Sequence, residues 1–212
     1  LEDFNAGRNA AAAKRFEAEA PALEAPEARR AARFMALLAH HDAGTCASQV
    51  SALESMATEW PLMAPYAWFY AGSCHLKEGD ADRARKAFAE VPSGSPLSPR
   101  AGDKLAESWL ALKRPDRAIA ALEASLSRHP DARAATWFQL IELKKKAGDA
   151  SGVRAARREL ATRMPRSIEG RAARKALGKA HGLRPDQLLR IAMSWYRTQS
   201  HRQALKAFRT LQ

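Results

Sequence analysis

Long apolar runs are absent from the 212-residue sequence, and so are the motifs of several common active sites. No stretch reaches the roughly 18 apolar residues that a membrane-spanning helix needs. There is no Cys-x-x-Cys, no His-Glu-x-x-His and no glycine-rich phosphate loop. The sequence therefore predicts no transmembrane segment, no metal or cofactor site and no catalytic residues.

Aromatic residues make up only 7% of the chain, glycine occurs 11 times, and no run of β-branched residues resembles a strand. Ala, Leu, Arg, Glu and Lys dominate, and these residues lose the least free energy on entering a helix. The hydrophobic fraction of 46% suits a folded protein with a core. The composition thus indicates an all-α protein.

Acidic residues are outnumbered, because 35 Lys and Arg stand against 23 Asp and Glu, a formal charge of +12. This excess suits an anionic partner, such as nucleic acid, an anionic membrane surface or an acidic cell-wall polymer. The basic residues are spread along the chain rather than clustered. This pattern is equally well explained without an anionic partner, by a genome that prefers Arg to Lys on solvated helix faces. Nucleic acid is not the expected partner, because equivalent positions lack constant base-contacting side chains.

A period of 34 to 35 residues runs through the middle of the chain. It is typical of tetratricopeptide repeats, in which each helical hairpin must stack on its neighbours to bury its apolar face. Small Gly72 is expected to let the two helices of its hairpin approach closely. Three columns of equivalent residues carry the period: Val50, Ala84, Ala118 and Val153; Phe34, Trp68, Gly102 and Trp137; Leu37, Ala71, Leu105 and Leu140.

The period predicts one helical-repeat domain over residues 1–212, folded as a right-handed superhelical solenoid of tetratricopeptide-like hairpins. Its parts are repeat units at 31–63, 64–97, 98–130 and 131–165, an extra helix at 167–180, and a final hairpin at 186–212. Residues 2–18 are expected to form one continuous helix. Because the array ends without a polar capping helix, we expect a C-terminal domain to follow in the parent protein.

Turns between paired helices are marked by Gly79-Asp80, Pro115-Asp116 and Gly148-Asp149. A Gly can end one helix, and the following Asp can cap the next by accepting its free N–H groups.

Cys46 and Cys74 are the only cysteines. Cys46 opens the second helix of one unit and Cys74 lies near the end of the first helix of the next, and stacking places these helices together. Small neighbouring residues would allow the close approach that a disulfide requires. We therefore predict a Cys46–Cys74 disulfide, which an oxidising periplasm would preserve. Two buried free thiols, or a metal site shared with His41 and His75, are the alternatives.

The first helix of each hairpin is expected to line the concave surface of such an array. Aromatic and basic side chains there would suit an acidic peptide or a glycan-peptide, unless a neighbouring domain or helix covers the groove. By repeat position, the candidate groove residues are Tyr66, Phe69, Lys77, Arg100, Phe138 and Lys145.

The stretch Glu59–Ala71, which reads Glu-Trp-Pro-Leu-Met-Ala-Pro-Tyr-Ala-Trp-Phe-Tyr-Ala, resembles the superhelical N-terminal region of soluble lytic murein transglycosylases. The resemblance implies a periplasmic or outer-membrane-associated protein of a Gram-negative bacterium, whose C-terminal domain cleaves peptidoglycan. Glu107-Ser108 matches the start of that family's catalytic signature, but the rest of the signature does not follow, so no catalytic role carries over.

The resemblance therefore implies a non-catalytic scaffold that holds its own C-terminal domain and contacts peptidoglycan or a protein partner. The competing interpretation is a partner-binding repeat protein of the bacterial envelope, such as an assembly or secretion accessory factor.

Overall fold

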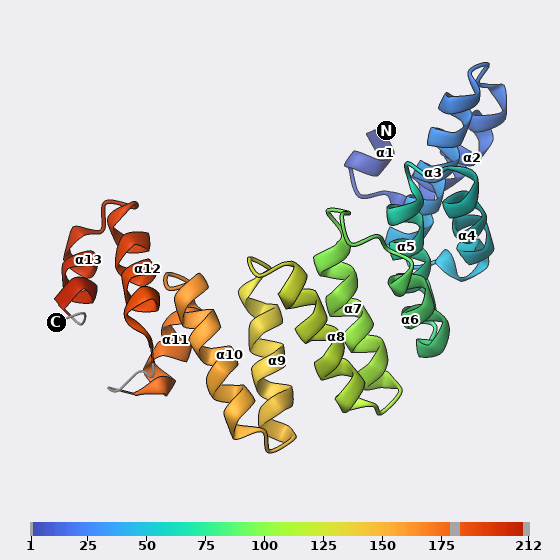
Figure 1. Cartoon of the computed structure of the whole chain (residues 1–212). Coiled ribbons are helices and arrows are strands. Elements are labelled where there is room, and N and C mark those ends of the chain that lie inside the picture. The colour runs from blue at the N-terminus through green and yellow to red at the C-terminus, as the bar shows by residue number, and fades with distance from the viewer. Residues whose placement is uncertain (1, 179–182, 210–212) are drawn as a thin grey trace. The chain divides into compact units, whose positions relative to one another are not determined.

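The computed structural model describes residues 2–178 and 183–209 (Figure 1). Within these ranges every regular element is a helix and no strand occurs, which confirms the predicted all-α fold. None of the described helices is both long enough and apolar enough to cross a membrane. The contacts divide the chain into two compact units, Leu1–Arg114 and Pro115–Gln212.

Helices of the first unit pack one on the next in chain order, from α2 against α3 to α6 against α7. Each hairpin therefore shares its apolar surface with its neighbours, as stacked repeats require. The helices are α1 (Glu2–Asn5), α2 (Asn9–Glu19), α3 (Pro26–Asp42), α4 (Val50–Glu59), α5 (Ala64–Lys77), α6 (Ala81–Ala89) and α7 (Ser98–Ala111), with short 3-10 turns η1 (Ala20–Ala22) and η2 (Cys46–Gln49).

The second unit contains α8 (Pro115–Arg128), α9 (Ala134–Lys146), α10 (Ala150–Arg163), α11 (Ile168–Leu177), α12 (Pro185–Tyr196) and α13 (His201–Phe208). Helix α11 corresponds to the extra helix expected at 167–180. It packs on α10, while α12 contacts both α10 and its own hairpin partner α13. Residues 179–180 of the expected extra helix and 210–212 of the expected final hairpin lie outside the described residues.

The single helix predicted over residues 2–18 is wrong, because α1 ends at Asn5 and α2 begins at Asn9. Gly7 lies in the break with φ of +73°, a left-handed conformation that glycine adopts without steric cost. The sequence did not reveal this break, because the alanine-rich residues that follow Gly7 have high helix propensity and suggested a continuous helix.

The Gly-Asp turns are built as the sequence predicts. Gly79 and Gly148 adopt φ of +83° and +75°, and the aspartate after each caps the next helix. Asp149 Oδ1 accepts a hydrogen bond from the Gly152 N–H at 2.8 Å, and its other oxygen accepts one from Lys144 Nζ at 3.0 Å. These bonds lower the pKa of Asp149 to about 2.

Close approach between α5 and α6 depends on Gly72, as expected. A Cβ atom at this position would lie 2.9 Å from two ring carbons of Phe88. Phe88 belongs to a core cluster with Phe69, Ala84, Val91 and Ala101. The missing side chain of Gly72 therefore provides the space that the Phe88 ring fills.

A disulfide joins Cys46 in η2 to Cys74 in α5, with the two Cα atoms 5.8 Å apart. Both cysteines are buried in a cluster that includes Leu37, Val50 and Leu53. With both sulfur atoms in this bond, neither is a thiolate that could bind a metal ion. No group of three or more His, Cys, Asp or Glu residues with a metal-binding arrangement occurs in the described part of the chain.

Excess positive charge is confined to the second unit. Residues 115–212 contain 21 Lys and Arg against 8 Asp and Glu, a formal charge of +13, whereas residues 1–114 contain 14 against 15, a formal charge of −1. Basic residues occur in both units, as expected, but their excess over acidic residues does not. The asymmetry emerges when the charge is summed within each structural unit.

We expect Gly72→Ala to lower the free energy of unfolding by about 1–3 kcal/mol, because the added methyl group overpacks the Phe88 contact. Gly94→Ala is the matched control, since no heavy atom lies within 4 Å of a Cβ built there. Urea unfolding followed by circular dichroism measures both variants. Equal stability of the two would contradict the close α5–α6 contact.

We expect no thiol to react when the denatured, unreduced protein is titrated with a thiol reagent, and two thiols per chain to react after reduction. A Cys46→Ser variant, which leaves Cys74 without its partner, calibrates the reagent at one thiol per chain. Two reactive thiols in the unreduced protein would rule out the Cys46–Cys74 bond.

Candidate functional site

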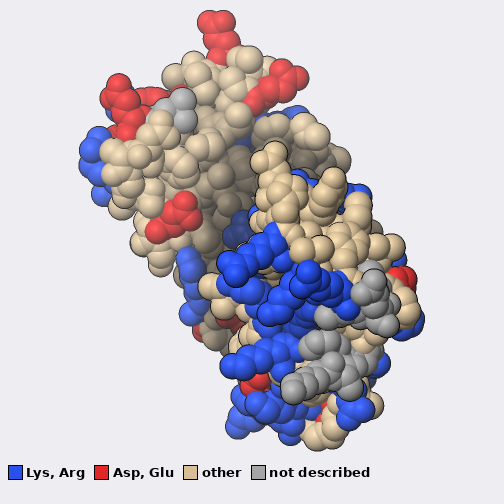
Figure 2. All heavy atoms as spheres, turned by 90° about the vertical axis from the view of Figure 1, so that its left-hand side faces the viewer, with Lys and Arg blue, Asp and Glu red and all other residues tan. Residues whose placement is uncertain are grey.

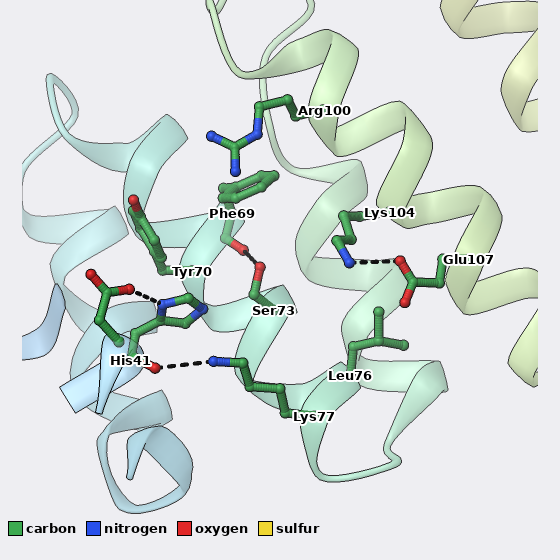
Figure 3. A pocket seen from close by; sticks show the side chains of 10 residues that line it. His41, Phe69, Tyr70, Ser73, Leu76, Lys77, Arg100, Lys104 and Glu107 are labelled. Atoms are coloured by element: carbon green, nitrogen blue, oxygen red, sulfur yellow. Dashed lines mark hydrogen bonds and ion pairs between the residues drawn. The ribbon is translucent and has the colours of Figure 1, made fainter. Parts of the chain in front are cut away.

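A pocket of about 350 Å³ in the first unit opens between α3, α5 and α7 (Figure 3). These are the first helices of three successive repeat units, which are the helices predicted to line a groove. The lining residues are His41 and Asp42 of α3; Phe69, Tyr70, Ser73, Leu76 and Lys77 of α5; and Arg100, Lys104 and Glu107 of α7.

An aromatic cluster forms one wall of the pocket. The Phe69 ring packs edge-on against Tyr70 at 5.7 Å and against Phe88 at 5.8 Å between ring centroids. Above it lies the guanidinium group of Arg100, with its Cζ atom 4.9 Å from the centre of the Phe69 ring (Figure 3). Phe69 is only 3% exposed, so it supports Arg100 and packs in the core more than it faces solvent.

Two cations of the pocket have no carboxylate within ion-pair distance among the described residues, namely Arg100 and Lys77. Lys77 Nζ donates a hydrogen bond to the backbone carbonyl of His41 at 3.0 Å. Lys104, in contrast, pairs with Glu107 at 2.6 Å on the same helix. The pocket therefore carries positive charge that its own acidic residues do not fully neutralise.

His41 adds no further positive charge at neutral pH. Burial lowers the pKa of this imidazole, and the nearby Lys77 ammonium lowers it further. A hydrogen bond between His41 Nδ1 and Asp42 Oδ1, at 2.9 Å, offsets only part of this effect. The His41 ring also packs edge-on against Tyr70, at 4.8 Å between centroids, where burial raises the pKa of the phenol.

Three of the six predicted groove residues meet in this pocket: Phe69, Lys77 and Arg100. Tyr66 lies on α5 one turn before Tyr70 and is not among the lining residues. Of the predicted residues in the first unit, Tyr66 lies outside the pocket, and Phe69 lines it while being buried.

Phe138 and Lys145, the other two predicted groove residues, lie on α9 in the second unit and do not line this pocket. Phe138 is 51% exposed, and Lys145 Nζ lies 3.8 Å from Glu142 Oε1 on the same helix. The repeat register gave them positions equivalent to the pocket residues, but the pocket itself is formed within the first unit.

Several lining residues were missed by the repeat columns but share a helix face with residues that were found. Ser73 lies one turn after Phe69 and one turn before Lys77, and its hydroxyl donates to the Phe69 carbonyl at 2.8 Å. Lys104 lies one turn after Arg100. The spacing of four residues on one helix face is the signal that would have found both.

Comparison with known families places repeats on two of the three pocket helices. A family model described as "Tetratricopeptide repeat" matches residues 66–98 and 100–132. The chain contains tetratricopeptide repeats. The first repeat includes the pocket residues of α5, and the second includes those of α7, so most of the pocket lies on matched repeats.

Comparison of the whole chain with curated proteins and solved structures identifies no family beyond the matched repeats. No curated protein matches the chain. A solved structure described as "Crystal structure of MamA" is 13% identical, with 81% of this chain and 90% of that chain covered and a TM-score of 0.48.

Proposed function

We propose that this chain is a non-catalytic scaffold whose pocket between α3, α5 and α7 binds an acidic segment of a protein partner. The observation that carries the proposal is the pair of cations, Arg100 and Lys77, beside the Phe69–Tyr70 wall without a carboxylate partner among the described residues. Tetratricopeptide repeats supply the rigid helices on which these side chains stand.

Arg100 is suited to bind a carboxylate of the partner. Its stacking on Phe69 fixes the plane of the guanidinium group, so less side-chain freedom is lost when the donors engage a ligand. A guanidinium can donate two parallel hydrogen bonds to one carboxylate, whereas the Lys77 ammonium acts as a compact point charge. The pocket's apolar surface, from Tyr70 and Leu76, then suits the aliphatic part of the peptide.

We expect Lys77→Ala combined with Arg100→Ala to weaken binding of an acidic peptide by about tenfold or more, since two charge-assisted contacts are lost. The probes are fluorescent ten-residue peptides of Asp, Glu and Leu, and matched peptides with Asn and Gln in place of the acids. Fluorescence anisotropy near physiological salt measures binding, because exposed charges attract less non-specifically when screened.

Lys145→Ala combined with Lys146→Ala is the charge-matched control, since both lysines are exposed on α9 and outside the pocket. This variant should bind as the unsubstituted protein does. Equal losses in both double variants, or equal binding of the acidic and amide peptides, would contradict a pocket specific for carboxylates. Phe69→Ala is unsuitable as a test, because removing this buried ring would disturb the core.

We further propose that the scaffold is the superhelical part of a periplasmic lytic transglycosylase of a Gram-negative bacterium. Two observations support it: the resemblance of the stretch Glu59–Ala71, and the Cys46–Cys74 disulfide, which suits an oxidising compartment. In that setting the pocket partner is a segment of the same cell-wall machinery, or a peptidoglycan stem peptide with its free carboxylates.

Reading the gene beyond the codon for Gln212 tests this parentage. A downstream series of Glu-Ser, Gly-Leu-Met-Gln and Asn-Tyr-Gly is the expected result for the enzyme. An immediate stop codon would instead favour an independent partner-binding protein of the envelope, for which the pocket between α3, α5 and α7 would serve equally well.

A further inference from the structure

A second pocket, of about 370 Å³, lies in the second unit between α11, α12 and α13. Four basic side chains line it and no acidic one does. The lining residues are Pro165, Arg171, Arg174, Lys175, Trp195, Gln203, Lys206 and Ala207.

These cations are not neutralised locally. No carboxylate lies within ion-pair distance of Arg174, Lys175 or Lys206 among the residues that the structure describes. Arg171 donates from Nη1 to the backbone carbonyl of Arg166 at 2.6 Å, which leaves its charge unpaired. Like charges held together without a counter-charge cost free energy, and an anionic ligand would recover it.

The surroundings reinforce this positive potential. A neighbouring pocket of the same unit is lined by Arg163, Arg166, Arg190 and Arg197, with Asp131 as its one acidic residue. The unit as a whole has a formal charge of +13. Figure 2 shows Lys and Arg side chains gathered on the face of this unit that is turned toward the viewer.

An exposed aliphatic residue lies on the same helix face as the cations. Ile168 is 74% exposed, and it precedes Arg171 by three residues and Lys175 by seven, so the three share one side of α11. Trp195 contributes an indole to the pocket from α12. Basic side chains beside an exposed aliphatic residue are typical of surfaces that lie on anionic bilayers.

We propose that the face of the second unit formed by Ile168, Arg171, Arg174, Lys175 and Lys206 docks on the phosphate headgroups of an anionic membrane. The guanidinium groups would bind phosphate oxygens, and Ile168 would enter the boundary between headgroups and acyl chains. The contact is peripheral and needs no membrane-spanning helix. It is independent of the first-unit pocket, which uses other residues.

The lipid surface is favoured over nucleic acid by two observations. Disulfides are rare in the cytosol and nucleus, where nucleic acid is concentrated, so the Cys46–Cys74 disulfide favours a partner outside those compartments. Binding of single strands generally uses exposed aromatic rings as stacking platforms, whereas the aromatic ring that lines this pocket, Trp195, is partly buried against Ile191, and the highly exposed Ile168 is aliphatic.

Vesicle co-sedimentation of the full 212-residue chain tests the proposal. Vesicles of phosphatidylcholine with an equal part of phosphatidylglycerol should bind the protein, and vesicles of phosphatidylcholine alone should not. Arg171→Ala combined with Lys175→Ala and Lys206→Ala should lower the partition coefficient by about tenfold or more, because each basic residue near an anionic surface contributes severalfold. Ile168→Ser should lower the part of the binding that remains at high salt.

Arg29→Ala combined with Arg30→Ala and Arg33→Ala is the matched control, since it removes the same charge from exposed positions of α3 in the first unit. Its binding should stay within about twofold of the unsubstituted protein. If the second-unit triple variant loses its helical circular dichroism, the single variants Arg171→Gln and Lys175→Gln replace it, each with an expected severalfold loss.

Three results would overturn the proposal: equal binding to neutral vesicles, equal losses in the control variant, or tighter binding of a single-stranded oligonucleotide than of vesicles at the same salt. If the oligonucleotide binds more tightly than the vesicles, and the triple variant of Arg171, Lys175 and Lys206 abolishes that binding, the same face would be assigned to nucleic acid.

Discussion

Close packing between consecutive helices is the constraint on which the rest of this structure depends. A single helical hairpin cannot cover its own apolar face, so each must lie against the next, and small residues set how near they come. Gly72 shows the point, because a Cβ atom there would meet the Phe88 ring at 2.9 Å. The Cys46–Cys74 disulfide adds a covalent link to the same stack of helices.

This packing determines where a ligand could bind. Second helices such as α4 and α6 pack against the helices on either side of them, whereas α3, α5 and α7 leave a face that forms the first-unit pocket. Phe69 illustrates how core and pocket are joined, because its ring belongs to the buried cluster and also lies against the guanidinium group of Arg100. A cation held over a buried ring is kept in place by the fold itself, and its charge remains available to a carboxylate.

The two units differ more in net charge than in fold. Both are built from helical hairpins, yet the first has a formal charge of −1 and the second of +13. Within the nearly neutral unit, two cations beside an aromatic wall favour a short acidic segment. Within the basic unit, unpaired cations beside Ile168 favour an extended anionic surface. The repeat architecture allows this division, because residues away from the packing columns are free to change without disturbing the stack.

The sequence by itself determined the helical class, the repeat period and the turns, since these depend on local features. Apolar residues 34 to 35 positions apart mark the packing columns, and a Gly-Asp pair ends one helix and caps the next wherever it occurs. The helix break at Gly7 was not predicted, because a single glycine among strong helix formers is a weak signal. Only the backbone of the structure shows the left-handed conformation of Gly7.

The tertiary structure decided which residues form a site. Repeat position predicted that Phe69, Lys77, Arg100, Phe138, Lys145 and Tyr66 face one groove, but the pocket requires side chains from three neighbouring helices. Only Phe69, Lys77 and Arg100 meet there, and they are joined by His41 from α3 and Lys104 from α7. The basic face of α11 likewise depends on packing, because Lys206 joins Arg171 and Lys175 only once α13 lies beside α11 and α12. Sequence fixes periodicity through local preferences, whereas the meeting of distant side chains requires the packed helices themselves.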